Sequence, residues 1–283
     1  MSSRTIHPRT LRKPCPVTFS NLSRLIDKPG LLTTDTPLTA AQKPFAKPEQ
    51  EWSDKETDLL GVIESVHPNA LIGTSTVHGA FTERIVRAMA SHTPRPIILP
   101  LSNPTRLHEA VPADLLHWTD GRALVATGSP FAPVRGPWGP EGRDVSIAVA
   151  ECNNSVVFPG VGLGCVLARV ERLTDKMLVA AVEGLAALSP ALHDPAAPLL
   201  PGVERVREVS VRVAREVIRA AIAEGVATER EIPEVEGELD EWIREQMWDP
   251  VYRPLKLVGM EGASRLAKGE LRVAASLGSV GRG

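Results

Sequence analysis

The sequence has few cysteines, a single tyrosine and no metal-binding pattern, and these absences exclude several classes of protein. Its 283 residues include three cysteines, at positions 15, 152 and 165, and no Cys-x-x-Cys pair. So few cysteines support neither a disulfide framework nor a zinc site, and a reducing compartment is the default expectation. The seven histidines are scattered, without a His-x-x-x-His pair that could bind a metal from one helix.

Long apolar runs and a strong net charge are also missing. No run reaches the roughly 18 apolar residues of a membrane-spanning helix, and no secretory signal is present. The net charge of −2 argues against nucleic acid or an anionic membrane as a main partner. The basic start resembles an organellar transit peptide, but prolines at 8, 14 and 16 would interrupt the helix that such a peptide needs. We therefore expect a cytoplasmic protein, with the mitochondrion as the alternative.

Apolar runs alternate with helical patterns through the middle of the chain. The runs at 70–73, 96–101 and 123–127 are apolar on both faces, and helical spacing occupies 82–91 and 110–119. Strands of this kind that alternate with helices indicate a parallel sheet covered by helices. The sequence therefore predicts an α/β fold with a Rossmann-like parallel sheet, from which the first strands and the Gly-rich loop are missing.

The pattern becomes helical after residue 154. Helices are expected at four places, which are 160–173, 175–188, 203–225 and 238–247. In terms of organisation, the sequence predicts an irregular N-terminal segment, a domain with C-terminal helices and a flexible tail, with bounds at 1–24, 25–255 and 256–283.

Three asparagines that look buried follow apolar runs, in Leu-Ser-Asn-Pro-Thr at 101–105 and in Glu-Cys-Asn-Asn at 151–154. In open α/β sheets, ligands bind outside the carboxyl ends of the strands. An amide at that edge offers two donors and an acceptor to a hydroxyl or carboxylate group. The alternative for Asn103 is an Asx-turn, and for Asn153 and Asn154 an ordinary turn.

Glycines mark two further loops and one helix start. Gly73 and Ser75 follow the first of the apolar runs, and Gly128 follows the third, where a missing side chain lets the backbone approach a ligand. The string Gly-Val-Gly-Leu-Gly at 160–164 imitates a dinucleotide fingerprint, but its sixth position is a cysteine and no proper strand precedes it. Close packing at a helix start explains it better, and we expect Gly162 to serve that packing.

Four strings in chain order carry a family resemblance. Leu-Ile-Gly-Thr-Ser, Leu-Ser-Asn-Pro-Thr, Ala-Thr-Gly-Ser-Pro-Phe and Glu-Cys-Asn-Asn resemble the nicotinamide-binding domain of malic enzymes, which oxidatively decarboxylate malate to pyruvate. The resemblance implies that malate contacts Asn103 and one of Asn153 and Asn154. It implies NAD or NADP contacts at Gly73, Ser75, Asn103, Gly128 and Asn154. It also implies Mg²⁺ or Mn²⁺ in the complete site, and a homo-oligomer.

The resemblance covers residues 25–255 and lacks the reacting half of that family's site. The dinucleotide fingerprint, the metal ligands, and the catalytic tyrosine and lysine would all precede residue 25, and Tyr252 lies in the tail segment. We therefore expect a partial malic enzyme that is inactive alone, with no catalytic and no metal-binding residue in this chain. The alternatives are a non-catalytic ligand-binding or oligomerisation module, and one half of a split enzyme completed by a separate N-terminal polypeptide.

Overall fold

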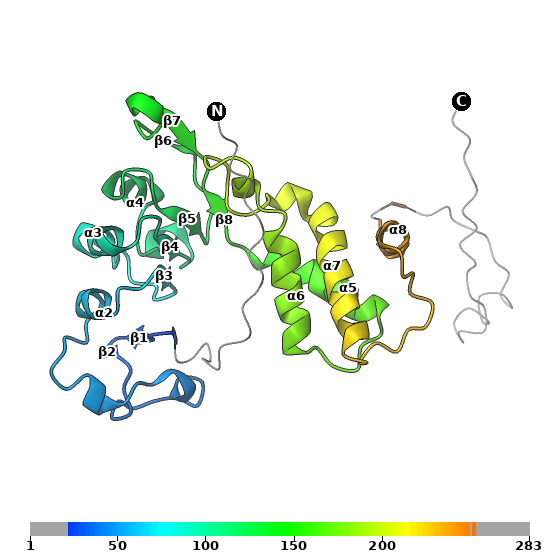
Figure 1. Ribbon diagram of the computed structural model, residues 1–283, viewed down its shortest axis with the longest axis horizontal. Helices are drawn as coiled ribbons and strands as arrows, with labels where there is room; N and C mark the ends of the chain where they lie inside the picture. The colour runs from blue at the N-terminus through cyan, green and yellow to red at the C-terminus, as the bar shows by residue number, and fades with distance from the viewer. Residues whose placement is uncertain (1–21, 250, 253–283) are drawn as a thin grey trace, which may run out of the picture. The chain divides into compact units, whose positions relative to one another are not determined.

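The computed structural model describes residues 22–249 and 251–252 (Figure 1). The chain divides after Glu245 into two units, and each is described by itself. Most of the expected irregular segment and all of the expected flexible tail lie outside the described residues. Within the described residues, no helix is both long enough and apolar enough to cross a membrane.

Four parallel strands form the central sheet. In sheet order they are β3 (Ala70–Gly73), β4 (Ile97–Pro100), β5 (Leu124–Thr127) and β8 (Ala150–Glu151). The three strands predicted from apolar runs are confirmed, and the register pairs Gly73 with Pro100 and Thr127 with Glu151. The α/β prediction with a Rossmann-like parallel sheet is confirmed. The fourth strand, β8, was not predicted, because two residues form no recognisable run.

Three helices pack against these strands, and the second and third of them confirm the helices predicted at 82–91 and 110–119. They are α2 (Leu59–Val66), α3 (Glu83–His92) and α4 (Pro112–Trp118). The Asp58 side chain caps α2 by accepting a hydrogen bond from the Gly61 amide at 2.7 Å, which satisfies one of the free N–H groups at a helix start. Proline begins α4, at a position where its missing N–H costs nothing.

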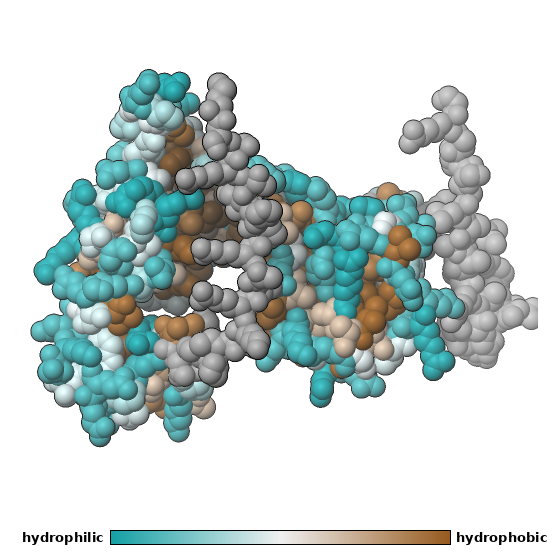
Figure 2. Space-filling model, viewed as in Figure 1, coloured by the Kyte–Doolittle hydropathy of each residue, from teal (hydrophilic) through white to brown (hydrophobic). Residues whose placement is uncertain are grey.

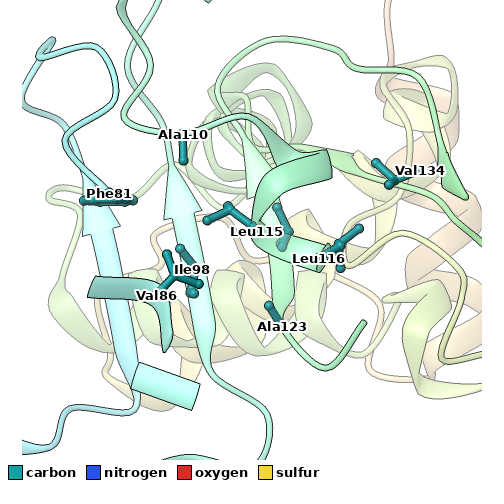
Figure 3. Close-up of a cluster of buried hydrophobic side chains, with 9 residues drawn as sticks. Phe81, Val86, Ile98, Ala110, Leu115, Leu116, Ala123 and Val134 are labelled. Atoms are coloured by element: carbon teal, nitrogen blue, oxygen red, sulfur yellow. The ribbon is translucent and has the colours of Figure 1, made fainter. Parts of the chain in front are cut away.

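The main hydrophobic core lies between the sheet and α3 and α4 (Figure 3). Val86 from α3, Ile98 from β4, and Leu115 and Leu116 from α4 are essentially inaccessible to solvent. Burying each of these side chains stabilises the fold by roughly 1.5–3 kcal/mol. A smaller cluster of Ile63, Ile85 and Met89 joins α2 to α3.

Two antiparallel hairpins flank the sheet, and short 3-10 turns fill the loops. The hairpins are β1 (Ile26–Asp27) with β2 (Gly30–Leu31), and β6 (Val134–Gly136) with β7 (Val145–Ile147). The 3-10 turns are η1 (Lys43–Phe45), η2 (Glu49–Glu51), η3 (Thr105–Leu107), η4 (Pro140–Gly142), η5 (Asn154–Val156), η6 (Pro190–Leu192) and η7 (Val203–Arg205). The first hairpin turns at Lys28 and Pro29.

Four helices follow the sheet and confirm the predicted helical C-terminal region. They are α5 (Phe158–Leu167), α6 (Asp175–Ala186), α7 (Val206–Ala223) and α8 (Glu236–Gln246). The Thr174 hydroxyl caps α6 by accepting from the Met177 amide. Helix α5 ends six residues earlier than expected, since Arg169 adopts a left-handed backbone conformation just beyond it.

The glycines of α5 set its distance from α7. A Cβ on Gly160 would lie 2.6 Å from Val213 Cβ, and one on Gly164 would lie 2.9 Å from Val217 Cβ. Nothing lies within 4 Å of the corresponding position at Gly162. The prediction that Gly162 serves packing is therefore wrong. Residues four apart share a helix face, so Gly160 and Gly164 face α7 together while Gly162 points away.

A buried arginine joins α7 to α8. The Arg215 side chain is 3% exposed, and its Nη1 atom lies 2.7 Å from Glu236 Oε1 and 2.9 Å from Asp240 Oδ2. Its Nε atom lies 3.3 Å from Glu216 Oε1. Three carboxylates therefore surround one guanidinium group, whose five N–H donors allow it to bind several carboxylates at once.

Candidate functional site

The loops that carry the predicted site residues leave the same edge of the sheet. Because the four strands are parallel, the segments that follow Gly73, Pro100, Thr127 and Glu151 start from one edge (Figure 1). This is the edge where open α/β sheets bind their ligands. We call the three loops 74–77, 101–104 and 128–131 the crevice loops, and they contain Ser75, Asn103 and Gly128, which are three of the six predicted contact residues.

Asn103 lies exposed in the second crevice loop, so the impression from the sequence that it is buried is wrong. Its Oδ1 atom accepts a hydrogen bond from the Ser129 hydroxyl, which ties this loop to the one after β5. The side chain therefore bonds to a neighbouring loop, whereas the Asx-turn alternative required a bond to its own backbone. Within the described residues its Nδ2 group makes no hydrogen bond, so this donor is available to a ligand.

Gly128 is needed where these two loops meet. A Cβ at this position would lie 2.2 Å from the Leu101 carbonyl oxygen and 2.9 Å from Asn103 Nδ2. Contacts this short are forbidden for any side chain. The sequence predicted that this glycine lets the backbone approach a ligand. In the structure it lets the Leu101 carbonyl and the Asn103 side chain approach the backbone.

Asn153 and Asn154 differ although they are adjacent, and both are exposed rather than buried. Asn153 accepts from the Ser155 amide at 2.9 Å and donates to Glu151 Oε1 at 3.0 Å, so its side chain is used within its own turn. This is the turn geometry that the sequence left as the alternative. Asn154 makes no side-chain hydrogen bond within the described residues, and its amide can act on a ligand.

The Gly73–Ser75 loop is built around a residue that the sequence analysis missed. Glu109 is fully buried, and its Oε1 atom accepts from the Ser75 amide at 2.8 Å and from the Ser75 hydroxyl at 2.9 Å. The same carboxylate accepts from the Ser102 hydroxyl and, at 3.4 Å, from the Ser102 amide. A Cβ on Gly73 would lie 2.5 Å from Glu109 Cδ, so the glycine makes room for the carboxylate.

The charges of this cluster follow from its contacts. Burial acts to raise the pKa of Glu109, but hydrogen bonds from Ser102, from its own backbone and from Ser75 outweigh burial and hold the pKa below its usual value. Burial and the neighbouring His78 lower the pKa of His108, against the opposing effect of Glu109. Glu109 is therefore ionised and His108 neutral at pH 7. The His108 ring packs against Phe131, with centroids 5.0 Å apart.

A sequence signal for Glu109 hardly exists. The residue stands in Leu-His-Glu-Ala, which is typical of a solvated loop before a helix. Its burial depends on Ser75, which lies 34 positions earlier in the chain. The only available signal is that Ser75 and Ser102 each follow an apolar run, which would suggest that both donate to the same buried acceptor.

The crevice loops present amides, hydroxyls and backbone groups, which bind and orient a ligand but transfer no proton at neutral pH. Across the described part of the chain, no group of three or more His, Cys, Asp or Glu residues is placed to hold a metal ion. By themselves, the described residues therefore do not form a metal site. Two surface pockets of about 160 and 220 Å³ lie elsewhere, lined by groups that include Arg122 and Arg212, respectively. Neither pocket contains a residue of the crevice loops.

Comparison with known proteins matches the chain to one family. Residues 20–222 match the family described as malic enzyme, NAD binding domain. The mitochondrial NAD-dependent malic enzyme of Saccharomyces cerevisiae is 46% identical over 248 residues, which cover 82% of this chain and 36% of that protein. NAD-dependent malic enzyme 3 of Bacillus subtilis is 46% identical over 241 residues, covering 82% and 40%. The NAD-dependent malic enzyme of Acinetobacter baylyi is 41% identical over 240 residues, covering 83% and 41%. The chain spans about two fifths of the length of these curated relatives.

Proposed function

Because the chain belongs to the malic enzyme family, in its NAD-binding domain, we propose that the crevice loops form the malate- and nicotinamide-facing wall of a malic enzyme active site. The observation that carries this proposal is the edge where the parallel strands end. There Asn103 presents its Nδ2 group and Asn154 its whole side-chain amide, and neither group bonds to a described residue, while Asn103 Oδ1 is held by Ser129. The names of the relatives, all NAD-dependent, favour NAD as the cofactor, with NADP as the alternative.

The roles that we propose follow from which groups are occupied. Asn103 donates through Nδ2 to an oxygen of malate while Ser129 holds its Oδ1 atom in place. Asn154 reaches the ligand directly, and Asn153 orients it by holding the turn. We place Gly73, Ser75 and Gly128 beside the cofactor. In this proposal NAD, when bound, accepts the hydride from malate, and the chain's own residues orient the two reactants.

We propose that residues 1–283 alone do not turn over malate. Oxidation needs a base for the hydroxyl proton, and decarboxylation needs an acid to protonate the product. The crevice loops supply neither group, and we derive no step through a metal, since the described residues do not fit one. The catalytic acid, the base and any metal ligands must then come from a further polypeptide segment, as in a complete or a split enzyme.

A chimera tests this proposal. The full chain would replace its matching segment in the Bacillus subtilis relative, and malate-dependent NAD reduction would be measured at 340 nm. We expect turnover by the chimera and none by the chain alone. Asn103→Ala in the chimera leaves a substrate oxygen unpaired, which should cost about 2–4 kcal/mol, or roughly 30- to 1,000-fold in kcat/KM.

Asn69→Ala is the matched control for this experiment. Asn69 precedes β3 at the opposite edge of the sheet, where its amide donates to Thr93 Oγ1 at 3.2 Å. This variant should keep kcat/KM within about twofold of the parent chimera, since it touches no crevice group. Turnover by the chain alone would refute the proposed inactivity, and an unaffected Asn103→Ala chimera would refute the proposed wall.

A second candidate function is an oligomerisation surface on the helical part. Leu178, Val179 and Val182 of α6 are 44%, 57% and 63% exposed, and their spacing places them on one side of the helix. Apolar areas are visible over the helical part in Figure 2. We propose that a second copy of the chain covers this stripe, and that Val182→Lys lowers the mass measured by sedimentation equilibrium. An unchanged mass would refute this surface.

We propose a cytoplasmic location, with the mitochondrion as the alternative. The name of the yeast relative places that protein in mitochondria.

A further inference from the structure

The adjacent residues His108 and Glu109 contact all three crevice loops. The His108 carbonyl accepts from the Gly79 amide at 3.2 Å, and the Glu109 carbonyl accepts from the Phe81 amide at 2.9 Å. These two bonds hold the end of the segment that begins with the first crevice loop. The His108 ring contacts Phe131 in the third loop. One dipeptide thus contacts all three crevice loops.

The Glu109 carboxylate is the central acceptor of this arrangement. Ser75 and Ser102 each give it an amide and a hydroxyl, so two loops share one pair of oxygens. The Thr76 amide donates to Ser102 Oγ at 2.8 Å, which joins the two loops a second time. Because Asn103 follows Ser102 in the chain, the carboxylate also sets where the asparagine begins.

Hydrogen bonds from two loops hold this carboxylate. Within the described residues no lysine or arginine pairs with Glu109, although it is fully buried. Burying a charge without a counter-charge is costly, and the donors of Ser75 and Ser102 offset that cost. Four donors aimed at one ionised group also define the relative position of two loops closely.

We infer that Glu109 is a positioning residue of the crevice, which holds the Ser75 loop and the Asn103 loop at the separation that a bound cofactor and substrate require. This inference rests on the proposed function, because that function places ligands on those loops. Glu109 itself touches neither ligand. It acts through Ser75 and Ser102.

The test compares Glu109→Gln with Asp58→Asn in the full 283-residue chain. Glutamine has nearly the same shape as glutamate but is uncharged, and its NH2 group would face the amides and hydroxyls of Ser75 and Ser102, which are themselves donors. Asp58 is the matched control, since it also accepts from a backbone amide, at the start of α2 and away from the crevice. Amide hydrogen exchange would be followed in these chains by mass spectrometry. NADH affinity would be measured by fluorescence titration, well below the melting temperatures, in the matching Bacillus subtilis chimeras, which supply the segments that this chain is expected to lack.

We expect the amides of Ser75, Thr76 and Ser102 to exchange roughly tenfold faster in Glu109→Gln, while exchange in α5 to α7 stays unchanged. Asp58→Asn should leave these three amides within about twofold of the parent chain. NADH affinity should fall about tenfold in Glu109→Gln and stay unchanged in Asp58→Asn. A residue that only stabilises the fold would lower the melting temperature without changing the affinity of the folded protein.

Two outcomes would overturn the inference. The first is unchanged exchange at the three amides in Glu109→Gln, and the second is loosened loops with unaltered NADH affinity. Failure of the parent chimera to bind NADH at all would instead count against the proposed cofactor site. In that case the exchange comparison alone decides whether Glu109 holds the loops.

Discussion

The crevice loops and the contact between helices α5 and α7 are held together in different ways. The loops are joined by hydrogen bonds to the buried Glu109, and their outer side chains stay exposed. Helices α5 and α7 instead meet through glycines fitted against valines. A polar anchor fixes the direction and separation of a few groups, whereas close packing responds to volume. The first arrangement suits a surface that binds a ligand, and the second suits a scaffold.

Replacing Arg215 by alanine is the severest test of this contrast, because it removes the polar anchor of the helical region. We expect a loss of about 3 kcal/mol in the free energy of unfolding, at the low end for a broken buried pair, since its partner carboxylates are partly exposed. Urea denaturation would measure it. A loss below about 1 kcal/mol would mean that packing alone holds α8 in place.

Enlarging Gly164 tests the packed side of the contrast. Gly164→Ala would bring a methyl group within 2.9 Å of both Val217 Cβ and the Ala214 carbonyl oxygen. We expect a loss of about 2 kcal/mol in the free energy of unfolding, since overpacking forces the two helices apart. Thermal and urea denaturation would both report it.

Gly162→Ala is the control for this substitution and makes the opposite prediction. Its Cβ would meet nothing within 4 Å, so alanine should raise the free energy of unfolding by roughly 0.5–1 kcal/mol through its greater helix propensity. If both alanines destabilised the chain equally, the one-sided contact between α5 and α7 would be wrong.

Lowering the pH tests the contribution of the buried Glu109 carboxylate to stability, and we expect the smallest effect here. The folded pKa of Glu109 lies below its usual value of 4.5, so its contribution to stability is present above that pH and is lost as the pH falls through the folded pKa. The difference in free energy of unfolding between the parent chain and Glu109→Gln should shrink below about pH 4.5. Because Glu109 also raises the pKa of His108, a change at higher pH belongs to His108, and only the change below about pH 4.5 belongs to the carboxyl group. A difference independent of pH would show that charge plays no part.

The strands and helices could be predicted because local pattern determines them. The run at 70–73 is the observed β3, and the run at 123–127 exceeds β5 by one residue. Apolar side chains on both faces leave a short segment few alternatives to a buried strand. The hairpin of β6 and β7 was not predicted, because its strands are only three residues long. It also depends on the packing of Gly136 against Trp138, which no periodic pattern in the sequence indicates.

The position of the site could be predicted from the sequence, but its hydrogen bonds and the burial of its residues could not. The end of β4 marked the place of Asn103, yet its exposure and its bond to Ser129 depend on a loop 26 residues away. Glu109 is further from prediction, because a glutamate in a polar loop is normally solvated and only the assembled loops bury it. Gly160 and Gly164 carried a usable signal, since small residues four positions apart mark the face of a helix that approaches a neighbour closely.

Because His108 and Glu109 contact all three crevice loops, they constrain how ligand specificity can evolve in this chain. A substitution in any one crevice loop shifts an anchor that the other two also use, so its effect on ligand choice reaches beyond its own loop. Loops with separate supports can be exchanged one at a time by mutation and selection. Here new ligand preferences should arise through paired substitutions, one at a loop and one at its anchor, and libraries that vary both together should outperform those that vary loops singly.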